Sequence, residues 1–194
     1  GTYCVFLGVH NLTDAVKTKK CINAETTTKH PKYDRFTFAN DVAVLKFKED
    51  LPLDDNAVKV CLPDKPIDNL EKAECYVTGW GLTETKKSSP VLMQTALDIK
   101  PPAICTKTWG NEIINELMIC AWGKPPKGKP EEVSDSCNGD SGGPMVCKRD
   151  NHWELQGVVS WGGECAHKKL PGVYARVTAL REFIDDAVKA TGGY

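Results

Sequence analysis

The fold and the chemistry of this chain are decided by ten residues, Asp135-Ser136-Cys137-Asn138-Gly139-Asp140-Ser141-Gly142-Gly143-Pro144. The stretch places a serine hydroxyl in a glycine-rich loop, directly after a carboxylate and four residues after a cysteine. Glycines on both sides let the backbone bend sharply and approach a substrate closely. They leave the amide N–H groups of Gly139 and Ser141 able to point at an oxyanion that develops during acyl transfer. The stretch therefore predicts that Ser141 is a nucleophile with an oxyanion hole beside it.

This stretch resembles the nucleophile loop of the chymotrypsin/trypsin family of serine proteases. The resemblance covers all 194 residues but begins partway into the first barrel of the family's fold. It implies an all-β protein with two antiparallel six-stranded β-barrels and a C-terminal helix, forming a single peptidase domain that lacks its N-terminal fifth. By this comparison, residues 1–70 are the remainder of the first barrel, residues 71–177 the second barrel, and residues 178–194 the helix and tail.

Asp41 lies just before an apolar run, 42–47, that predicts a buried strand. Taken alone, an aspartate ahead of a strand is more often a turn residue. The segment 38–47 resembles the family's Asn-Asp-Ile-Ala-Leu-Leu strand, however, and it precedes Asp140 and Ser141 in the expected chain order. The resemblance thus implies that Asp41 orients the catalytic imidazole and stabilises the imidazolium.

No histidine of this chain fits the family's third catalytic position. A serine hydroxyl is a poor nucleophile without a base, and the family carries that base in an Ala-Ala-His-Cys-like motif upstream of the aspartate. The four histidines, His10, His30, His152 and His167, lie in no such motif, and we interpret them as surface or turn residues. The simplest account is a second, shorter light chain that supplies the histidine and the missing strands, because an open first barrel would expose aggregation-prone edges.

The resemblance also implies a primary specificity pocket. Asp135 resembles the pocket floor of trypsins, where a carboxylate favours Arg or Lys, although without the resemblance it reads as a solvated loop residue. Ser136 can hydrogen-bond a lysine ammonium. The implied pocket walls are Ser160, Trp161, Gly162 and Gly172. Glu164 departs from the family, which usually has glycine there, and this leaves the subsite preferences open. Asp140 resembles the carboxylate that pairs with the ammonium freed by zymogen cleavage.

Nine cysteines indicate disulfides and hence an oxidising, extracellular setting. A zinc site is the alternative, but the chain has no close Cys-x-x-Cys pairs. Spacing cannot settle connectivity, and the family pattern implies the pairs Cys75–Cys147, Cys105–Cys120 and Cys137–Cys165. Cys4 and Cys21 flank a loop that they could close. Cys61 is then left over, either as a free thiol or, as we favour, bonded to the light chain.

Composition limits the remaining functions. A formal net charge of −1 gives no electrostatic case for nucleic acid or an anionic membrane surface, and no segment approaches the roughly 20 apolar residues that span a bilayer. Without a signal peptide or pro-segment, the chain reads as a mature secreted product. The sequon Asn11-Leu12-Thr13 predicts glycosylation of Asn11. The stretch 9–20 lacks glutamates and carries three lysines, so we expect no calcium there. We expect no other metal and no cofactor.

Short β-rich runs alternate with turns, which favours antiparallel β structure. The predicted strands are 5–7, 42–47, 76–80, 92–97, 155–161 and 173–177. A single convincing helix is predicted near the C-terminus, with Thr178 as its N-cap, an apolar stripe from Ala179 to Val188, and Gly192-Gly193 beyond its end.

Two functions follow from these patterns. The favoured one is a secreted, two-chained serine endopeptidase that cleaves after Arg or Lys, with this chain as the heavy chain. More loosely, the chain resembles the earthworm fibrinolytic enzymes, which look like glycosylated trypsins. The alternative is a non-catalytic protease homologue that binds a partner through the same groove. The presence of Asp41, Asp135, Gly139 and Ser141 together favours catalysis, because a binding module has no need for all four.

Overall fold

Nine strands and three α-helices make up the described part of the chain. The structure is a computed structural model that describes residues 3–83, 85–125, 128, 129, 134–165, 167 and 169–192. The elements are, in order, β1 (Cys4–Val5), α1 (Leu12–Thr18), β2 (Ile22–Lys29), β3 (Ala43–Phe47), a short 3₁₀-helix (Leu70–Lys72), β4 (Cys75–Gly79), β5 (Met93–Lys100), α2 (Pro102–Trp109), β6 (Met118–Gly123), β7 (Pro144–Arg149), β8 (His152–Trp161), β9 (Gly172–Arg176) and α3 (Val177–Ala190).

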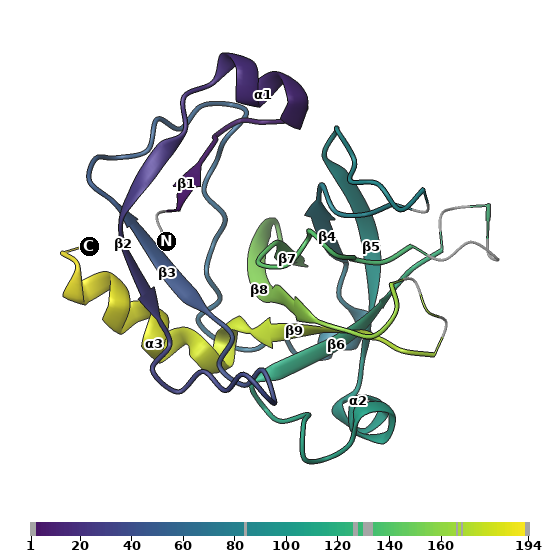
Figure 1. Ribbon diagram of the computed structural model, residues 1–194. Coiled ribbons are helices and arrows are strands. Elements are labelled where there is room, and N and C mark those ends of the chain that lie inside the picture. The colour runs from purple at the N-terminus through teal and green to yellow at the C-terminus, as the bar shows by residue number, and fades with distance from the viewer. Residues whose placement is uncertain are drawn as a thin grey trace.

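Six antiparallel strands close into a barrel in the order β4-β5-β6-β9-β8-β7, and β1, β2 and β3 form a separate sheet (Figure 1). The barrel interior is filled by apolar side chains, and Leu97, Met145 and Tyr174 have no exposed surface. Because the barrel is closed, each of its six strands is hydrogen-bonded to a neighbour on both edges, which removes the aggregation risk of open edges. The prediction of a mostly-β fold with a closed six-stranded barrel and a C-terminal helix is confirmed. A complete first barrel stays a prediction, since β1, β2 and β3 form a three-stranded sheet.

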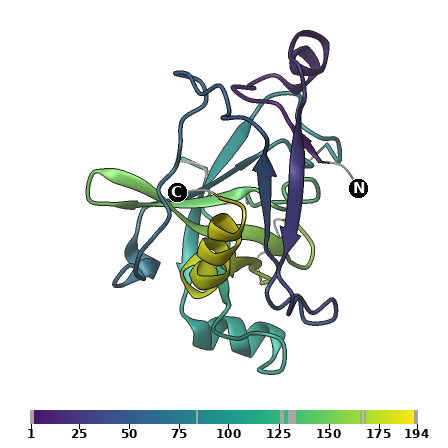
Figure 2. The same cartoon turned by 90° about the vertical axis from the view of Figure 1, so that its left-hand side faces the viewer.

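Helix α3 joins the three-stranded sheet to the barrel. Leu180 and Ile184 are buried in one apolar cluster with Val44 of β3 and Val158 of β8. Each such side chain contributes about 1.5–3 kcal/mol when fully buried. Figure 2 shows α3 between the three-stranded sheet and the β7–β8 hairpin. The helix thus fixes β3, and the Asp41 that precedes it, against the barrel.

The predicted helix boundaries need correction. Helix α3 begins at Val177, with Arg176 as its N-cap and no side-chain cap, so the expectation that Thr178 caps it is wrong. The reason is tertiary, because the backbone N–H of Arg176 donates to the carbonyl of Leu117 at 2.7 Å and holds the chain extended until the helix starts. Gly192 does follow the helix in a left-handed conformation, with φ of +74°, as a helix end favours.

Helices α1 and α2 are absent from the sequence-based prediction, although both carry start signals. The side-chain oxygen of Asn11 accepts hydrogen bonds from the N–H groups of Thr13 and Asp14, at 2.9 and 3.2 Å, and so caps α1. Helix α2 has Pro102 in its first turn and Gly110 directly after its last. The cap uses the oxygen of Asn11 and leaves its nitrogen, the atom that a glycan would take, so α1 is compatible with the predicted glycosylation.

Strands β2, β6 and β7 also lie outside the predicted set. Strand β6 is buried almost throughout, and such a continuous apolar run lacks the alternation that identifies a strand. Strand β2 is rich in polar residues, and its pairing with β3 is interrupted by a bulge between Ala24 and Thr26. Both are strands because neighbours satisfy their backbone groups, which a local pattern does not show.

Four disulfides tie the elements together. Cys75–Cys147 joins β4 to β7, Cys105–Cys120 joins α2 to β6, Cys137–Cys165 joins the segment before Ser141 to the loop after β8, and Cys4–Cys21 closes the loop around α1. Cys61 is unpaired and exposed within these residues. In the described residues, no helix is long and apolar enough to cross a membrane.

A buried carboxylate organises the β7–β8 hairpin. Glu154 is 5% exposed and accepts hydrogen bonds from Nε of Arg149 at 2.8 and 2.9 Å and from Gln156 at 2.8 Å, with His152 at 3.1 Å. Desolvation alone would raise the pKa of Glu154, but the bonds from Arg149, His152 and Gln156 outweigh it and hold this pKa below its ordinary value. Arg149 also donates to the carbonyl of Lys65 at 2.7 Å. The cluster therefore binds the hairpin to the segment that connects the sheet and the barrel.

We expect Arg149→Ala to lower the free energy of unfolding by about 3 kcal/mol at neutral pH, because it leaves Glu154 as a buried charge without its main partner. Since the pKa of Glu154 is lower in the folded state, this stabilisation is present above the unfolded value and disappears as the pH falls through the folded one. Urea unfolding with the disulfides intact should therefore show the deficit shrinking below about pH 4.5. The adjacent Lys148→Ala, which removes an exposed pair with Glu74, is the control and should change little. A deficit that persists unchanged in acid would contradict this account.

Candidate active site

Ser141 lies on an exposed turn that is anchored to β8. The N–H of Gly142 donates to the carbonyl of Val159 at 2.8 Å, and the N–H of Val159 donates to the carbonyl of Gly143 at 2.9 Å. Gly139 has φ of +98° and Gly142 φ of +83°, values that favour glycine. Among the described residues, the N–H groups of Gly139 and Ser141 have no hydrogen-bond acceptor. The turn thus presents a hydroxyl and two backbone donors that remain available to a ligand.

Asp41 is tied to the barrel by a short hydrogen bond. It follows Asn40, which has φ of +59° and whose side chain donates to the carbonyl of Lys32 at 2.9 Å. The hydroxyl of Ser160 donates to Oδ2 of Asp41 at 2.6 Å, across 119 residues of sequence. Sequence reasoning assigned Ser160 only to a pocket wall. Its contact with Asp41 depends on the docking of β3 against β8, so no local signal could have indicated it.

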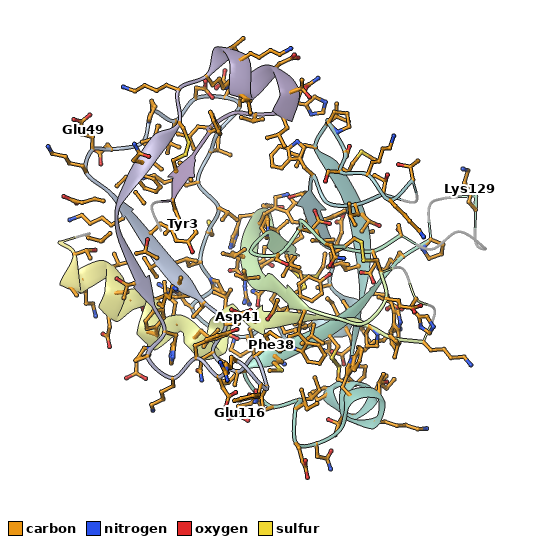
Figure 3. All side chains as sticks on the ribbon, viewed as in Figure 1. Tyr3, Phe38, Asp41, Glu49, Glu116 and Lys129 are labelled. Carbon is orange, nitrogen blue, oxygen red and sulfur yellow. A yellow bond between two sulfur atoms is a disulfide. The ribbon has the colours of Figure 1, made fainter. Side chains whose placement is uncertain are left out.

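Asp41 and Ser141 line one cavity of about 540 Å³ between the three-stranded sheet and the barrel. Its lining includes Tyr3, Thr27 and Leu45 on the sheet side and Val158 on the barrel side. Figure 3 shows Asp41 at the junction of sheet and barrel, with Tyr3 farther up the sheet side of this space. The cavity leaves room between the serine and the aspartate for a further side chain.

The four histidines lie elsewhere. His30 packs against the ring of Phe183 in α3, with 4.5 Å between centroids and a tilt of 54° between the ring planes, and burial, followed by the charge of Lys32, lowers its pKa. His152 contacts the buried glutamate of the β7–β8 hairpin. The ring of His167 accepts a local backbone hydrogen bond, and the carbonyl of His10 bonds to the N–H of Leu92. None of them lines either cavity that contains Ser141.

A second cavity, of about 280 Å³, is lined by Ser141 and by Asp135. Ser136, Ser160, Trp161, Gly162 and Gly172, the remaining residues predicted for the pocket, line it as well. A Cβ on Gly162 would lie 3.5 Å from the Cα of Gly172, and one on Gly172 would lie 3.6 Å from Oδ1 of Asp135. The two glycines therefore keep open a slot that leads to a carboxylate.

Aromatic rings form one wall of this pocket. Phe38 stacks on Trp161 with 6.0 Å between centroids, and Trp109 meets Trp161 edge-on at 5.0 Å. Phe38 and Asp41 reach the barrel on the same segment (Figure 3). Sequence reasoning missed Phe38, which lines the pocket, and Trp109, which packs against Trp161, since both take these positions only through tertiary packing.

Asp140 lines a third cavity, of about 260 Å³, which Asp135 and Ser136 also line. Its carboxylate accepts hydrogen bonds from the N–H groups of Gly81 at 2.8 Å and Cys137 at 2.9 Å. Burial of Tyr174, together with the charges of Asp135 and Asp140, raises the pKa of the tyrosine hydroxyl, which therefore stays protonated. Gly79 and Gly81 lie close to the Asp140 carboxylate, and they were the sequence signal for the hydrogen bonds that hold it, although the prediction did not use them.

No metal site is formed by the described residues, in which no group of three His, Cys, Asp or Glu side chains could hold an ion. In the stretch 9–20, Nζ of Lys19 donates to the carbonyls of Leu7 at 2.6 Å and Gly8 at 2.7 Å. The ammonium group of Lys19 thus donates hydrogen bonds to two carbonyl oxygens beside this stretch. The groups that the site does present are a hydroxyl, carboxylates and backbone donors, which support nucleophilic and electrostatic chemistry.

A closed β-barrel that carries a serine on a glycine-rich turn, in one cavity with a hydrogen-bonded carboxylate, has the arrangement expected of a serine hydrolase. The family model described as Trypsin matches residues 1–184 of this sequence. The chain therefore belongs to the trypsin family. This membership supports a trypsin-like serine protease of the endopeptidase type.

Proposed function

We propose that this protein is a secreted serine endopeptidase that hydrolyses peptide bonds after Arg or Lys through a Ser-His-Asp acyl-enzyme mechanism. The observation that carries the proposal is the position of Ser141, which lines both the cavity that contains Asp41 and the pocket that contains Asp135. A substrate side chain in the pocket would thus hold its scissile carbonyl beside the hydroxyl.

In this mechanism, an imidazole held by Asp41 takes the proton of Ser141 as the oxygen attacks the carbonyl. The N–H groups of Gly139 and Ser141 stabilise the oxyanion, a contribution worth about 3–4 kcal/mol per donor. The imidazolium then protonates the leaving amine, and water releases the acyl group by the reverse sequence. Asp135 favours a cationic side chain because its negative charge lies in a narrow pocket beside Ser141 and attracts a guanidinium or ammonium group.

The histidine would come from a light-chain segment that fills the cavity of about 540 Å³. The same segment would provide an ammonium to pair with Asp140. Cys61 supports a covalent link to it, because its thiol is exposed while its backbone is held by Trp153 and Leu155 of β8. Val58 and Val60, 79% and 42% exposed, lie beside it in sequence and offer apolar surface for such a partner.

The test compares the native preparation with the 194-residue chain alone. We expect the native protein to hydrolyse Arg and Lys esters and to be labelled at Ser141 by an organophosphonate, and the chain alone to be inactive. Reduction should release the histidine-bearing peptide if Cys61 carries it. Activity confined to aromatic or small residues would refute the pocket assignment.

The other outcomes of this test are equally informative. Absence of labelling in the native protein would favour the non-catalytic homologue. Full activity of the chain alone would overturn the assignment of roles, since its histidines lie away from Ser141. Fibrinolytic activity rests only on the loose resemblance to the earthworm enzymes, and a fibrin-plate assay of the native protein tests it.

A further inference from the structure

Glu164 gives the Asp135 pocket a second carboxylate. Both residues line the cavity of about 280 Å³, together with Ser141. Asp135 is half-buried, whereas Glu164 is exposed, so the two acids lie at different depths in the pocket. Asp135 belongs to the inner part, and Glu164 belongs to the part that opens to solvent.

The backbone that carries Glu164 is held on both sides. Cys165, which follows it, is bonded to Cys137, two residues after Asp135. Gly163, which precedes it, packs closely on one side, because a Cβ there would lie 2.8 Å from Leu170 and 3.0 Å from Trp109. The disulfide and this packing therefore keep the second carboxylate at the pocket.

Among the residues that the structure describes, none forms an ion pair or hydrogen bond with the carboxylate of Glu164. A substrate with one positive charge, directed to Asp135, leaves this second carboxylate unmatched. A substrate with two neighbouring positive charges can pair with both Asp135 and Glu164. Because the carboxylate is exposed, solvent and salt screen the added attraction, which limits its size.

We propose that Glu164 makes the pocket selective for dibasic ligands, in which a second positive charge adjoins the Arg or Lys that Asp135 binds. The inference rests on the proposed function, since it takes Asp135 as the primary recognition group. It specifies the substrate class further, as polypeptides with paired basic residues at the cleavage site.

The test measures binding, which does not require the catalytic histidine. The probes are benzamidine, with one amidinium group, and bis-benzamidines of graded linker length, with two. We expect Glu164→Gln to weaken the best bis-benzamidine about two- to fivefold relative to benzamidine, the range for an exposed ion pair, and the difference to fade at high salt. Glu49→Gln, which removes an exposed charge far from the pocket (Figure 3), is the matched control and should leave the ratio unchanged.

The outcomes separate this inference from the proposed function. If Glu164→Gln weakens both probes equally, or leaves their ratio unchanged, dibasic selectivity is wrong. If benzamidine fails to bind, or its binding is indifferent to Asp135→Asn, then the primary pocket is misassigned and the proposed function fails with it. If Asp135→Asn weakens the binding of both probes while Glu164→Gln weakens only that of the bis-benzamidine, the primary pocket and the dibasic selectivity are both supported.

Discussion

Replacing Asp41 with asparagine should lower kcat of the native protease by about 10⁴-fold, the size of the effect that this change has in Ser-His-Asp triad enzymes. The hydroxyl of Ser160 donates to Oδ2 of Asp41 at 2.6 Å. In the asparagine variant this hydroxyl would select the amide oxygen, so the amide nitrogen would face the imidazole. An N–H donor there favours the wrong tautomer of the histidine, which then cannot take the proton of Ser141.

The matched control for Asp41→Asn is Ser160→Ala. It removes the hydrogen bond but keeps the carboxylate, so we expect a loss on the order of 10-fold, in keeping with a bond to a charged group. Steady-state kinetics with an Arg ester and thermal unfolding of each variant provide the measurements. Activity of Asp41→Asn within tenfold of the parent protein, with its fold intact, would show that Asp41 is not the orienting group.

Replacing Gly79 with alanine should lower kcat/KM by about 10²-fold, the typical loss when a reacting group moves by about 1 Å. A Cβ on Gly79 would lie 1.9 Å from Oδ1 of Asp140 and 2.8 Å from its Cγ. The carboxylate cannot yield freely, because the N–H groups of Gly81 and Cys137 hold it. Displacement of Asp140 would move the adjoining Ser141 and the oxyanion donors with it.

Gly110→Ala is the control for this substitution, since a Cβ there would meet nothing within 4 Å. It should keep its activity, although its positive φ costs some stability. For Gly79→Ala we also expect a loss of about 1–3 kcal/mol of stability, as overpacking produces. An active Gly79→Ala variant would mean that the turn tolerates movement of Asp140 and that its anchoring is not needed for catalysis.

Local sequence patterns predicted the β-rich class and the C-terminal helix, because apolar periodicity and turn residues are short-range signals. They failed where pairing partners decide the structure. Strand β6 is buried on both faces and shows no alternation, and the start of α3 is set by a bond between Arg176 and Leu117. The Asn11 side chain that caps α1 and the Pro102 and Gly110 that bound α2 are local signals for these helices. Asn11 also lies in the glycosylation sequon, and the prediction used it only for that purpose.

The sequence by itself determined which residues could do the chemistry. The glycine-rich stretch around Ser141 is a short pattern whose backbone requirement is local, whereas the roles of Asp41 and Asp135 were predicted only through the resemblance to the trypsin family. Only the tertiary structure decided how they meet, because β3 reaches the barrel through α3, and long-range contacts bring Ser160 to Asp41 and Gly79 to Asp140. It also put Glu164 and Asp135 in one pocket, since a disulfide and close packing join segments that the chain itself separates.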